Sequence, residues 1–210
     1  MYALKQVGTK SILFVMAAEP EYGTQLKQIF SPLMCGVGPV ESAVEVTHAL
    51  AELSLRNDLP DVLVSLGSAG SSTLKQAEVY QATSVSYRDM DASPLGFEKG
   101  KTPFLDLPVE NVLPFLIPGV PTARLSTGAN IVSGDAYKDI DAEMVDMESF
   151  AILRSCMKFD VPMVALRGIS DGKEELKKMT DWTEYLDTID QKLAQTVEKL
   201  FKVIMSGEIL

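Results

Sequence analysis

Residues 161–175 read VPMVALRGISDGKEE, and this stretch indicates the fold more clearly than any other. The apolar, β-branched run from Val161 to Arg167 is typical of a strand that is buried on both faces of a sheet. The run then breaks off, and the predicted strand ends by delivering the carboxylate of Asp171. One interpretation makes Asp171 the N-cap of a following helix, with Glu174 completing a capping box. The other places Asp171 in a ligand pocket.

Short apolar runs alternate with helical patterns along the rest of the chain. Further strands are predicted at Ser11–Ala17, Leu33–Val37, Asp61–Leu66, Val79–Tyr87 and Thr122–Val132. Helices are predicted from Pro20 or Glu21, from Pro39 to Leu53, from the Asp146-Met147-Glu148 segment to about Lys158, and from Trp182 to Ile204, the last with a cap from Asp181 and Glu184. This alternation predicts an α/β sheet covered on both faces. We expect one domain over residues 1–210, with its core at 11–205 and a long loop from Asp91 to Pro108.

Composition narrows the classes of function. The 210 residues are 46% hydrophobic and 23% charged, enough for one substantial core, and their net charge is −10 without any basic run. Nucleic acid and anionic membrane surfaces are therefore not expected partners. No apolar run approaches the ~18 residues that a membrane-spanning helix needs, and the N-terminus lacks a signal-peptide pattern.

The cysteine and histidine content points to carboxylate chemistry. Cys35 and Cys156 lie in apolar or helical contexts, which is typical of reduced core thiols in a cytosolic protein. His48 is the single histidine, so neither a histidine-rich metal site nor a Ser-His-Asp triad is expected. We expect His48 to be a satisfied or half-exposed helix residue, and no metal site.

The predicted strand ends carry small residues, hydroxyls and acids. They are AEPE at 18–21, CGVG at 35–38, GSAG at 67–70, SGD at 133–135 and SD at 170–171. Because ligands bind outside the carboxyl ends of strands in open α/β sheets, a polar small-molecule pocket is predicted there. GSAGSS fits either an anion-binding nest or a plain turn. CGVG lacks the third glycine of a dinucleotide fingerprint, and a tight turn explains it more simply.

Seven motifs, taken together, resemble the nucleoside phosphorylase and nucleosidase superfamily. They are AAEPE (17–21), CGVGPVESA (35–43), VSLGSAGS (64–71), SYRDMDASPLGFEKG (86–100), IVSGDAY (131–137), DMESFA (146–151) and RGISDG (167–172). They most resemble the methylthioadenosine/S-adenosylhomocysteine nucleosidases. The resemblance implies a three-layer sandwich around a central mixed β-sheet. It also implies hydrolysis of the N-glycosidic bond of adenine thionucleosides without a cofactor, and a homodimer.

The same resemblance implies catalytic roles for three acids. Asp171 matches the acid that protonates the leaving base, and Glu21, rather than Glu19, matches the residue that activates water. Glu148, next to Met147, matches the acceptor for the ribose hydroxyls. A carboxyl at the end of an apolar strand is also placed to have a raised pKa, as a general acid for adenine requires.

Further residues match substrate contacts in that family. Tyr137 stands where a stacking Phe is usual, and Lys138 follows it in a segment that is shorter than usual before Glu148. Trp182 at the 5′ side favours a small methylthio group over a homocysteine tail. The remaining expected contacts are Ser68, Ala69, Gly70, Phe97, Pro103, Arg167 and Ser170.

Three alternatives remain open. A phosphate-dependent phosphorylase would normally carry an Arg before its GSxG turn, where this chain has Ser65, so phosphate would depend on backbone amides, Arg88 or Arg167. A nucleosidase for another purine nucleoside, such as a futalosine-type compound, is the second. A protein that binds nucleosides without cleaving them is the third, although Glu21, Glu148 and Asp171 are all present.

Overall fold

The computed structural model describes residues 2–172 and 178–209, which build a nine-stranded mixed sheet. Its strands are β1 (Leu4–Val7), β2 (Lys10–Met16), β3 (Leu33–Met34), β4 (Val62–Gly70), β5 (Val79–Tyr87), β6 (Glu110–Val112), β7 (Thr122–Thr127), β8 (Met144–Asp146) and β9 (Met163–Asp171). β9 pairs parallel with β4 and antiparallel with β5, while β5 continues through β7 and β8 back to β4. The middle of the sheet therefore closes on itself like a small barrel.

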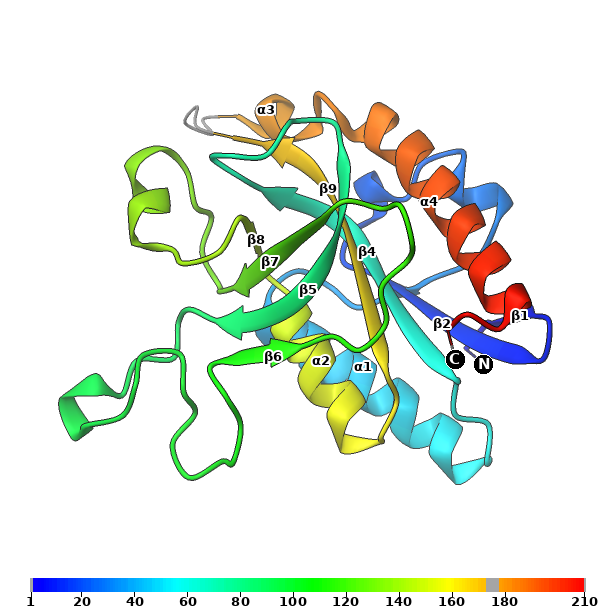
Figure 1. The fold of residues 1–210 in the computed structure, drawn as a ribbon, viewed down its shortest axis with the longest axis horizontal. Helices are drawn as coiled ribbons and strands as arrows, with labels where there is room; N and C mark the ends of the chain where they lie inside the picture. The colour runs from blue at the N-terminus through cyan, green and yellow to red at the C-terminus, as the bar shows by residue number, and fades with distance from the viewer. Residues whose placement is uncertain (1, 173–177, 210) are drawn as a thin grey trace.

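Helices cover both faces of this sheet (Figure 1). α1 (Pro39–Leu55) and α2 (Ser149–Lys158) pack together on one face, and α4 (Leu186–Ser206) lies on the other beside the short α3 (Met179–Thr183). Four 3₁₀ turns complete the regular structure: η1 (Glu19–Glu21), η2 (Leu26–Gln28), η3 (Ser93–Leu95) and η4 (Gly134–Asp139). The predicted α/β architecture, a mixed sheet between two helical layers, is confirmed.

The central strand β4 shows why the sequence folds this way. Val62, Val64 and Leu66 lie in the α4-side core, whereas Leu63 belongs to the core under α1 and α2. Because successive side chains point to opposite faces and both faces are covered, the first half of the strand, Val62–Leu66, is apolar at every position except Ser65. Each such side chain contributes about 1.5–3 kcal/mol of burial free energy.

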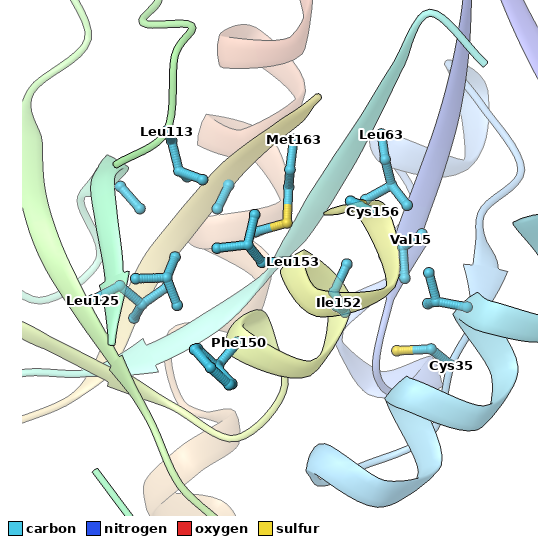
Figure 2. Packing of buried hydrophobic residues seen from close by; sticks show 14 of the residues in the cluster. Val15, Cys35, Leu63, Leu113, Leu125, Phe150, Ile152, Leu153, Cys156 and Met163 are labelled. Carbon is cyan, nitrogen blue, oxygen red and sulfur yellow. The ribbon is translucent and has the colours of Figure 1, made fainter. Parts of the chain in front are cut away.

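The two cysteines lie in the core between the sheet and the helices α1 and α2 (Figure 2). Cys35 and Cys156 are both buried and unpaired, as expected, and burial raises the pKa of each thiol to about 12. Neither cysteine is available as a nucleophile near neutral pH. None of the helices in the described part of the chain has the length and apolar character to cross a membrane.

The two central strands are longer than the sequence pattern predicted. β9 continues through Asp171 and β4 through Gly70, because the strands stay paired, with one register shift, as far as Gly70 and Asp171. The predictions of a turn or nest at GSAG, and of a strand ending at Arg167, are wrong. Asp171 is the last residue of a strand rather than an N-cap, and Glu174 lies outside the described residues.

Three other predicted elements are shorter than expected. The helix predicted from Pro20 or Glu21 is replaced by η1 and η2, where Asp190 of α4 accepts the backbone N–H groups of Gln25 and Leu26. The strand predicted to reach Val132 ends at Thr127, where Arg88 binds the carbonyls of the following loop. Of Leu33–Val37, only the first two residues are a strand.

The C-terminal helix is also interrupted. It was predicted to run unbroken from Trp182, but α3 ends at Thr183 and α4 begins at Leu186. Asp181 does take part in a helix cap, but as the third residue of α3, where it accepts the backbone N–H of the N-cap Lys178; Glu184 is at the other end of that helix. The break turns Trp182 toward the strand ends while Leu186 packs in the α4-side core.

The connection between β5 and β6 projects from the body of the molecule (Figure 1). It contains the predicted long loop, with only η3 as regular structure. Its Phe97 and Phe104 rings meet edge to face with centroids 5.6 Å apart, and Phe104 is 95% exposed.

Candidate active site

A cavity of about 500 Å³ opens where β4, β8 and β9 end. Its wall contains Glu21, Ser68, Ala69, Gly70, Met147, Glu148, Asp171 and Trp182, all expected from the sequence. The remaining wall residues are Ala17, Ala18, Val37, Arg88, Asn130, Ile131, Val132, Val145, Asp146, Lys178 and Met179. The predicted pocket at the strand ends is therefore present, and it is mostly apolar with a few acids.

Glu21 enters the cavity from η1. Its Oε1 accepts hydrogen bonds from the backbone N–H of Ser68 at 2.7 Å and from the Ser68 hydroxyl at 2.6 Å. Gly67 permits this approach, because a Cβ there would lie 3.1 Å from Oε2. Burial raises the pKa of Glu21 even though the two Ser68 hydrogen bonds oppose the shift. The buried Oε2 has no hydrogen-bond partner within the described residues.

Asp171 lies at the end of β9 and is 8% exposed. Its Oδ1 accepts a 2.7 Å hydrogen bond from the Ser170 hydroxyl, and the Tyr137 hydroxyl is 3.5 Å from Oδ2. Gly70 leaves room for both groups, because a Cβ there would lie 2.3 Å from the Tyr137 oxygen and 2.6 Å from Oδ2. Burial raises the pKa of Asp171, with the two hydrogen bonds opposing the shift.

Glu148 is the N-cap residue of α2, directly after β8. Its Oε1 accepts the backbone N–H of Gly38 at 2.8 Å, and Gly38 has a φ of 93°, which favours glycine. Burial, followed by repulsion from Asp146, raises the pKa of Glu148 to about 7. Its side chain therefore exchanges a proton near neutral pH.

Arg167 lies behind the cavity wall rather than in it. Its Nη2 is 3.0 Å from Oδ2 of Asp146 and also donates to the hydroxyls of Ser65 and Ser149. The Arg167 and Asp146 side chains are 2% and 1% exposed. A second cavity of about 10 Å³ separates Arg167 from the large one, with Glu21 and Glu148 also in its wall.

The other expected contacts lie at different depths. Ser170 and Tyr137 are buried and reach the cavity through Asp171. Lys138 is exposed and pairs with Asp135 at 2.7 Å. Phe97 and Pro103 lie on the projecting β5–β6 connection and are not part of the cavity wall. The single chain therefore brings Glu21, Glu148 and Asp171 to one cavity and leaves Phe97 and Pro103 outside it.

The sequence reading assigned no role to several wall residues. Asn130 and Ile131 follow β7, and they were hidden because the predicted strand ran through them. Val37 follows β3 in the CGVG turn, and Lys178 and Met179 precede Trp182 on α3. The rule that ligands gather at strand ends would have found the first three, given correct strand boundaries.

No group of three or more His, Cys, Asp or Glu within residues 2–172 and 178–209 is arranged to hold a metal ion. His48 is exposed on α1 and forms a 3.2 Å contact with Glu52.

Several known proteins are similar in sequence to this chain. The chain is 27% identical over 190 residues to a 5′-methylthioadenosine/S-adenosylhomocysteine nucleosidase of Exiguobacterium, with 81% of this chain and 78% of that protein covered. It is 29% identical over 183 residues to the enzyme of that name from Staphylococcus aureus, with 79% and 78% covered.

Solved structures share the fold. The 5′-methylthioadenosine/S-adenosylhomocysteine nucleosidase of Neisseria meningitidis in complex with methylthio-immucillin-A matches with a TM-score of 0.74 at 20% identity, covering 93% of this chain and 98% of that one. A futalosine hydrolase mutant of Helicobacter pylori matches with a TM-score of 0.70 at 19% identity, covering 94% and 99%. The family model described as the phosphorylase superfamily matches residues 27–204, and the chain belongs to this superfamily.

Proposed function

We propose that this protein hydrolyses the N-glycosidic bond of a purine nucleoside of the methylthioadenosine type and releases the base. The observation that carries the proposal is the carboxyl of Asp171, which is buried in the cavity wall and has a raised pKa. Adenine leaves readily only when it is protonated, so the reaction needs an acid that still holds its proton near neutral pH. We assign Asp171 this role, with the proton delivered to N7.

Glu21 is proposed to activate the attacking water. Its Oε1 is occupied by two donors from Ser68, so only Oε2 is available as a base. Oε2 is buried without a partner in the described structure, and Glu21 also lines the 10 Å³ cavity, a volume that suits one water. Arg167 lies in the wall of the same cavity and supplies positive charge near the nucleophile.

Glu148 and Met147 are proposed to hold the ribose. Glu148 keeps one oxygen on the Gly38 amide and has the other available for vicinal hydroxyls. As the glycosidic bond breaks, the sugar gains positive charge, which a neighbouring carboxylate stabilises. Ser68, Ala69 and Gly70 line the same cavity, and the Tyr137 ring lies behind Asp171 on the base side.

Hydrolysis is preferred to phosphorolysis because both candidate arginines are already engaged. Arg167 is paired with Asp146 and bonded to Ser65. Arg88 donates to the carbonyls of Ser126, Asp146, Gly128 and Asn130. Neither arginine has its terminal guanidinium nitrogens free for a bidentate phosphate contact.

The apolar end of the cavity supports a short, apolar 5′ substituent. Ala17, Ala18, Val37, Met179 and Trp182 are apolar residues of the cavity wall and are proposed to face this substituent. The nucleosidases named above act, by their names, on methylthioadenosine and S-adenosylhomocysteine, and we propose the first as the preferred substrate. A futalosine-type nucleoside is the second candidate, because a futalosine hydrolase shares the fold.

A homodimer in the cytosol completes the proposal. Phe97 and Pro103, expected at the 5′ side, lie on the projecting connection that also carries the exposed Phe104. In a dimer, that connection would add apolar side chains to the partner's cavity. No cofactor, nucleic acid or membrane partner is part of the proposed reaction.

The test is product analysis with purified protein. Methylthioadenosine, S-adenosylhomocysteine and futalosine are each incubated with and without inorganic phosphate, and the free base and the sugar product are quantified. Base release that is independent of phosphate and fastest with methylthioadenosine supports the proposal. Formation of the 1-phosphate of the 5-substituted ribose (5-methylthioribose 1-phosphate from methylthioadenosine) would make the protein a phosphorylase, and failure to release a base from any substrate would overturn the proposal.

A further inference from the structure

We propose that Trp182 is a positioning residue that orients Glu21 through Ser68. In this arrangement the indole N–H donates a hydrogen bond to the Ser68 oxygen. The hydroxyl hydrogen of Ser68 is thereby directed at Oε1 of Glu21. Oε2 is then the oxygen that receives the proton of water. The inference rests on the proposed role of Glu21 as the base. It adds a residue that acts without touching the reacting atoms.

The contacts define a chain with one direction. Nε1 of Trp182 lies 2.9 Å from the Ser68 oxygen, which lies 2.6 Å from Oε1 of Glu21. An indole N–H can only donate, and a serine hydroxyl has one hydrogen and two acceptor sites. Because Trp182 donates to Ser68, the single hydrogen of Ser68 is left for Glu21. The backbone N–H of Ser68 also donates to Oε1, at 2.7 Å, so both donors converge on one carboxylate oxygen.

Two donors on Oε1 make the carboxylate asymmetric. An oxygen that accepts two short hydrogen bonds retains negative charge, and a proton therefore adds more readily to the other oxygen. Oε2 is the oxygen without a described partner, and Glu21 borders both cavities. The chain from Trp182 thus determines which oxygen acts as the base.

The hydrogen-bond chain from Trp182 through Ser68 also connects α3 to Glu21, the proposed base. Trp182, Met179 and Lys178 belong to or adjoin α3, and all three line the large cavity. The indole can bond Ser68 only when α3 lies against the end of β4. The hydrogen bond therefore ties the orientation of Glu21 to the position of α3 at the cavity wall.

Other ionisable groups near Glu21 affect its pKa or titrate beside it, so an experiment must separate their titration from that of Glu21. Arg167 lowers the pKa of Glu21 and Asp146 raises it. Glu148 titrates in the same region, and Cys35 keeps its proton because burial raises the pKa of its thiol to about 12. Because the pKa of Glu148 is raised to about 7, a Glu148→Gln background removes its titration from the signal assigned to Glu21.

The direct test uses the fact that Trp182 is the single tryptophan of the chain. The protein then has one indole N–H signal in a ¹H–¹⁵N spectrum, which is recorded from pH 4 to pH 9 in the Glu148→Gln background. We expect this signal to move as Glu21 titrates and to lose that dependence in Glu21→Gln. In Ser68→Ala we expect it to shift upfield, because the acceptor is gone. An indole signal that is unchanged in Ser68→Ala overturns the proposal, whether or not the protein is a nucleosidase.

The kinetic test is a double-mutant cycle. Trp182→Phe keeps an aromatic ring but removes the donor, and we expect kcat/KM to fall by roughly 3- to 10-fold, the scale of one hydrogen bond. The acidic limb of the pH profile should move to higher pH, because weaker donation from Ser68 raises the pKa of Glu21. In the Ser68→Ala background, Trp182→Phe should have no further effect on that limb.

A purely structural role for Trp182 would give a different pattern. In that case Trp182→Phe would raise KM without moving the acidic limb of the pH profile. Its effect would also be the same with and without the Ser68 hydroxyl. Either result would contradict the hydrogen-bond chain from Trp182 through Ser68 to Glu21. Tyr185→Phe is the matched control, since it removes an aromatic hydroxyl two residues after α3 from a side chain outside the cavity wall. We expect that variant to retain the wild-type pH profile.

Discussion

Acids are buried in two different ways at the end of this sheet. Asp146 is neutralised: Arg167 is 3.0 Å away, and Thr127 and the backbone N–H of Ser149 also donate to it. Asp171, at the end of β9 on the other side of β4, receives only hydroxyl groups and has no ion pair with any described residue. The first arrangement compensates a buried carboxyl with a cation, and the second leaves a carboxyl without one, so that burial raises the pKa of Asp171.

The difference separates stability from chemistry within a few ångströms. A buried ion pair is costly to break, because the remaining charge is left without compensation. A buried carboxyl without a cation opposes folding once it ionises, but it can exchange a proton near neutral pH. The predictions below test this division, from the largest expected effect to the smallest.

Asp171→Asn should have the largest effect, on activity alone. The amide keeps the shape of the side chain but cannot protonate the base, so turnover should fall by at least ~10²-fold, within the usual ~10²–10⁴-fold range for a general acid. The thermal midpoint should stay close to that of the wild type. Asp58→Asn, an exposed carboxylate in the turn between α1 and β4, is the control and should retain full activity. Near-normal turnover in Asp171→Asn would refute the role of the acid.

Arg167→Met should mainly lower stability. It leaves Asp146 charged and buried, at a cost of about 3–5 kcal/mol in the free energy of unfolding, measured by urea denaturation. Arg124→Met removes an ion pair that is about one-third exposed, with Glu143 and Asp141, and should cost about 1 kcal/mol or less. Equal losses in the free energy of unfolding of the two variants would show that burial does not make the Arg167–Asp146 pair more costly to break.

Glu148→Gln should increase stability at alkaline pH. The pKa of Glu148 is about 7 in the folded protein against 4.5 in the unfolded chain, so the wild type loses stability as pH rises between these values. The shift corresponds to about 3 kcal/mol at pH 8, which the neutral amide does not lose. The amide oxygen can still accept from Gly38. Thermal midpoints should differ at pH 8 and converge near pH 4; a variant that is less stable at pH 8 would contradict the shift.

Tyr137→Phe should have the smallest effect. Its hydroxyl donates to Asp171 over 3.5 Å and slightly lowers the pKa of that carboxyl. Without it, the alkaline limb of the rate profile should move to higher pH by less than about one unit. The phenol itself does not titrate in this range, because burial and the neighbouring Asp171 raise its pKa. A limb that moves to lower pH would show that Tyr137 does not donate to Asp171.

The sequence was sufficient for the sheet, because β4 and β9 are buried on both faces and leave continuous apolar runs. The sequence did not predict correctly where the strands and helices end. GSAG resembles a turn, yet it is strand, since its glycines make room for the side chains of Glu21, Asp171 and Tyr137. Such close approaches depend on partners that are distant in sequence.

The acids of the site were predicted through motifs, and their environments were not. No local pattern shows that Arg167 pairs with Asp146 and leaves Asp171 without a cation. The contact between Trp182 and Ser68 joins residues 114 positions apart and depends on the break between α3 and α4. The apolar stripe of residues 182–204 predicted one helix because Trp182 fits that stripe as well as it fits the cavity.

The most direct test of the central claim is the pH dependence of phosphate-free adenine release from methylthioadenosine. Because the raised pKa of Asp171 keeps its proton on the carboxyl, the account predicts release without phosphate and a kcat/KM that falls as pH rises through that pKa. The falling limb should be absent from the residual activity of Asp171→Asn. No adenine release, or a rate that stays level to pH 9 in the wild type, would contradict the account.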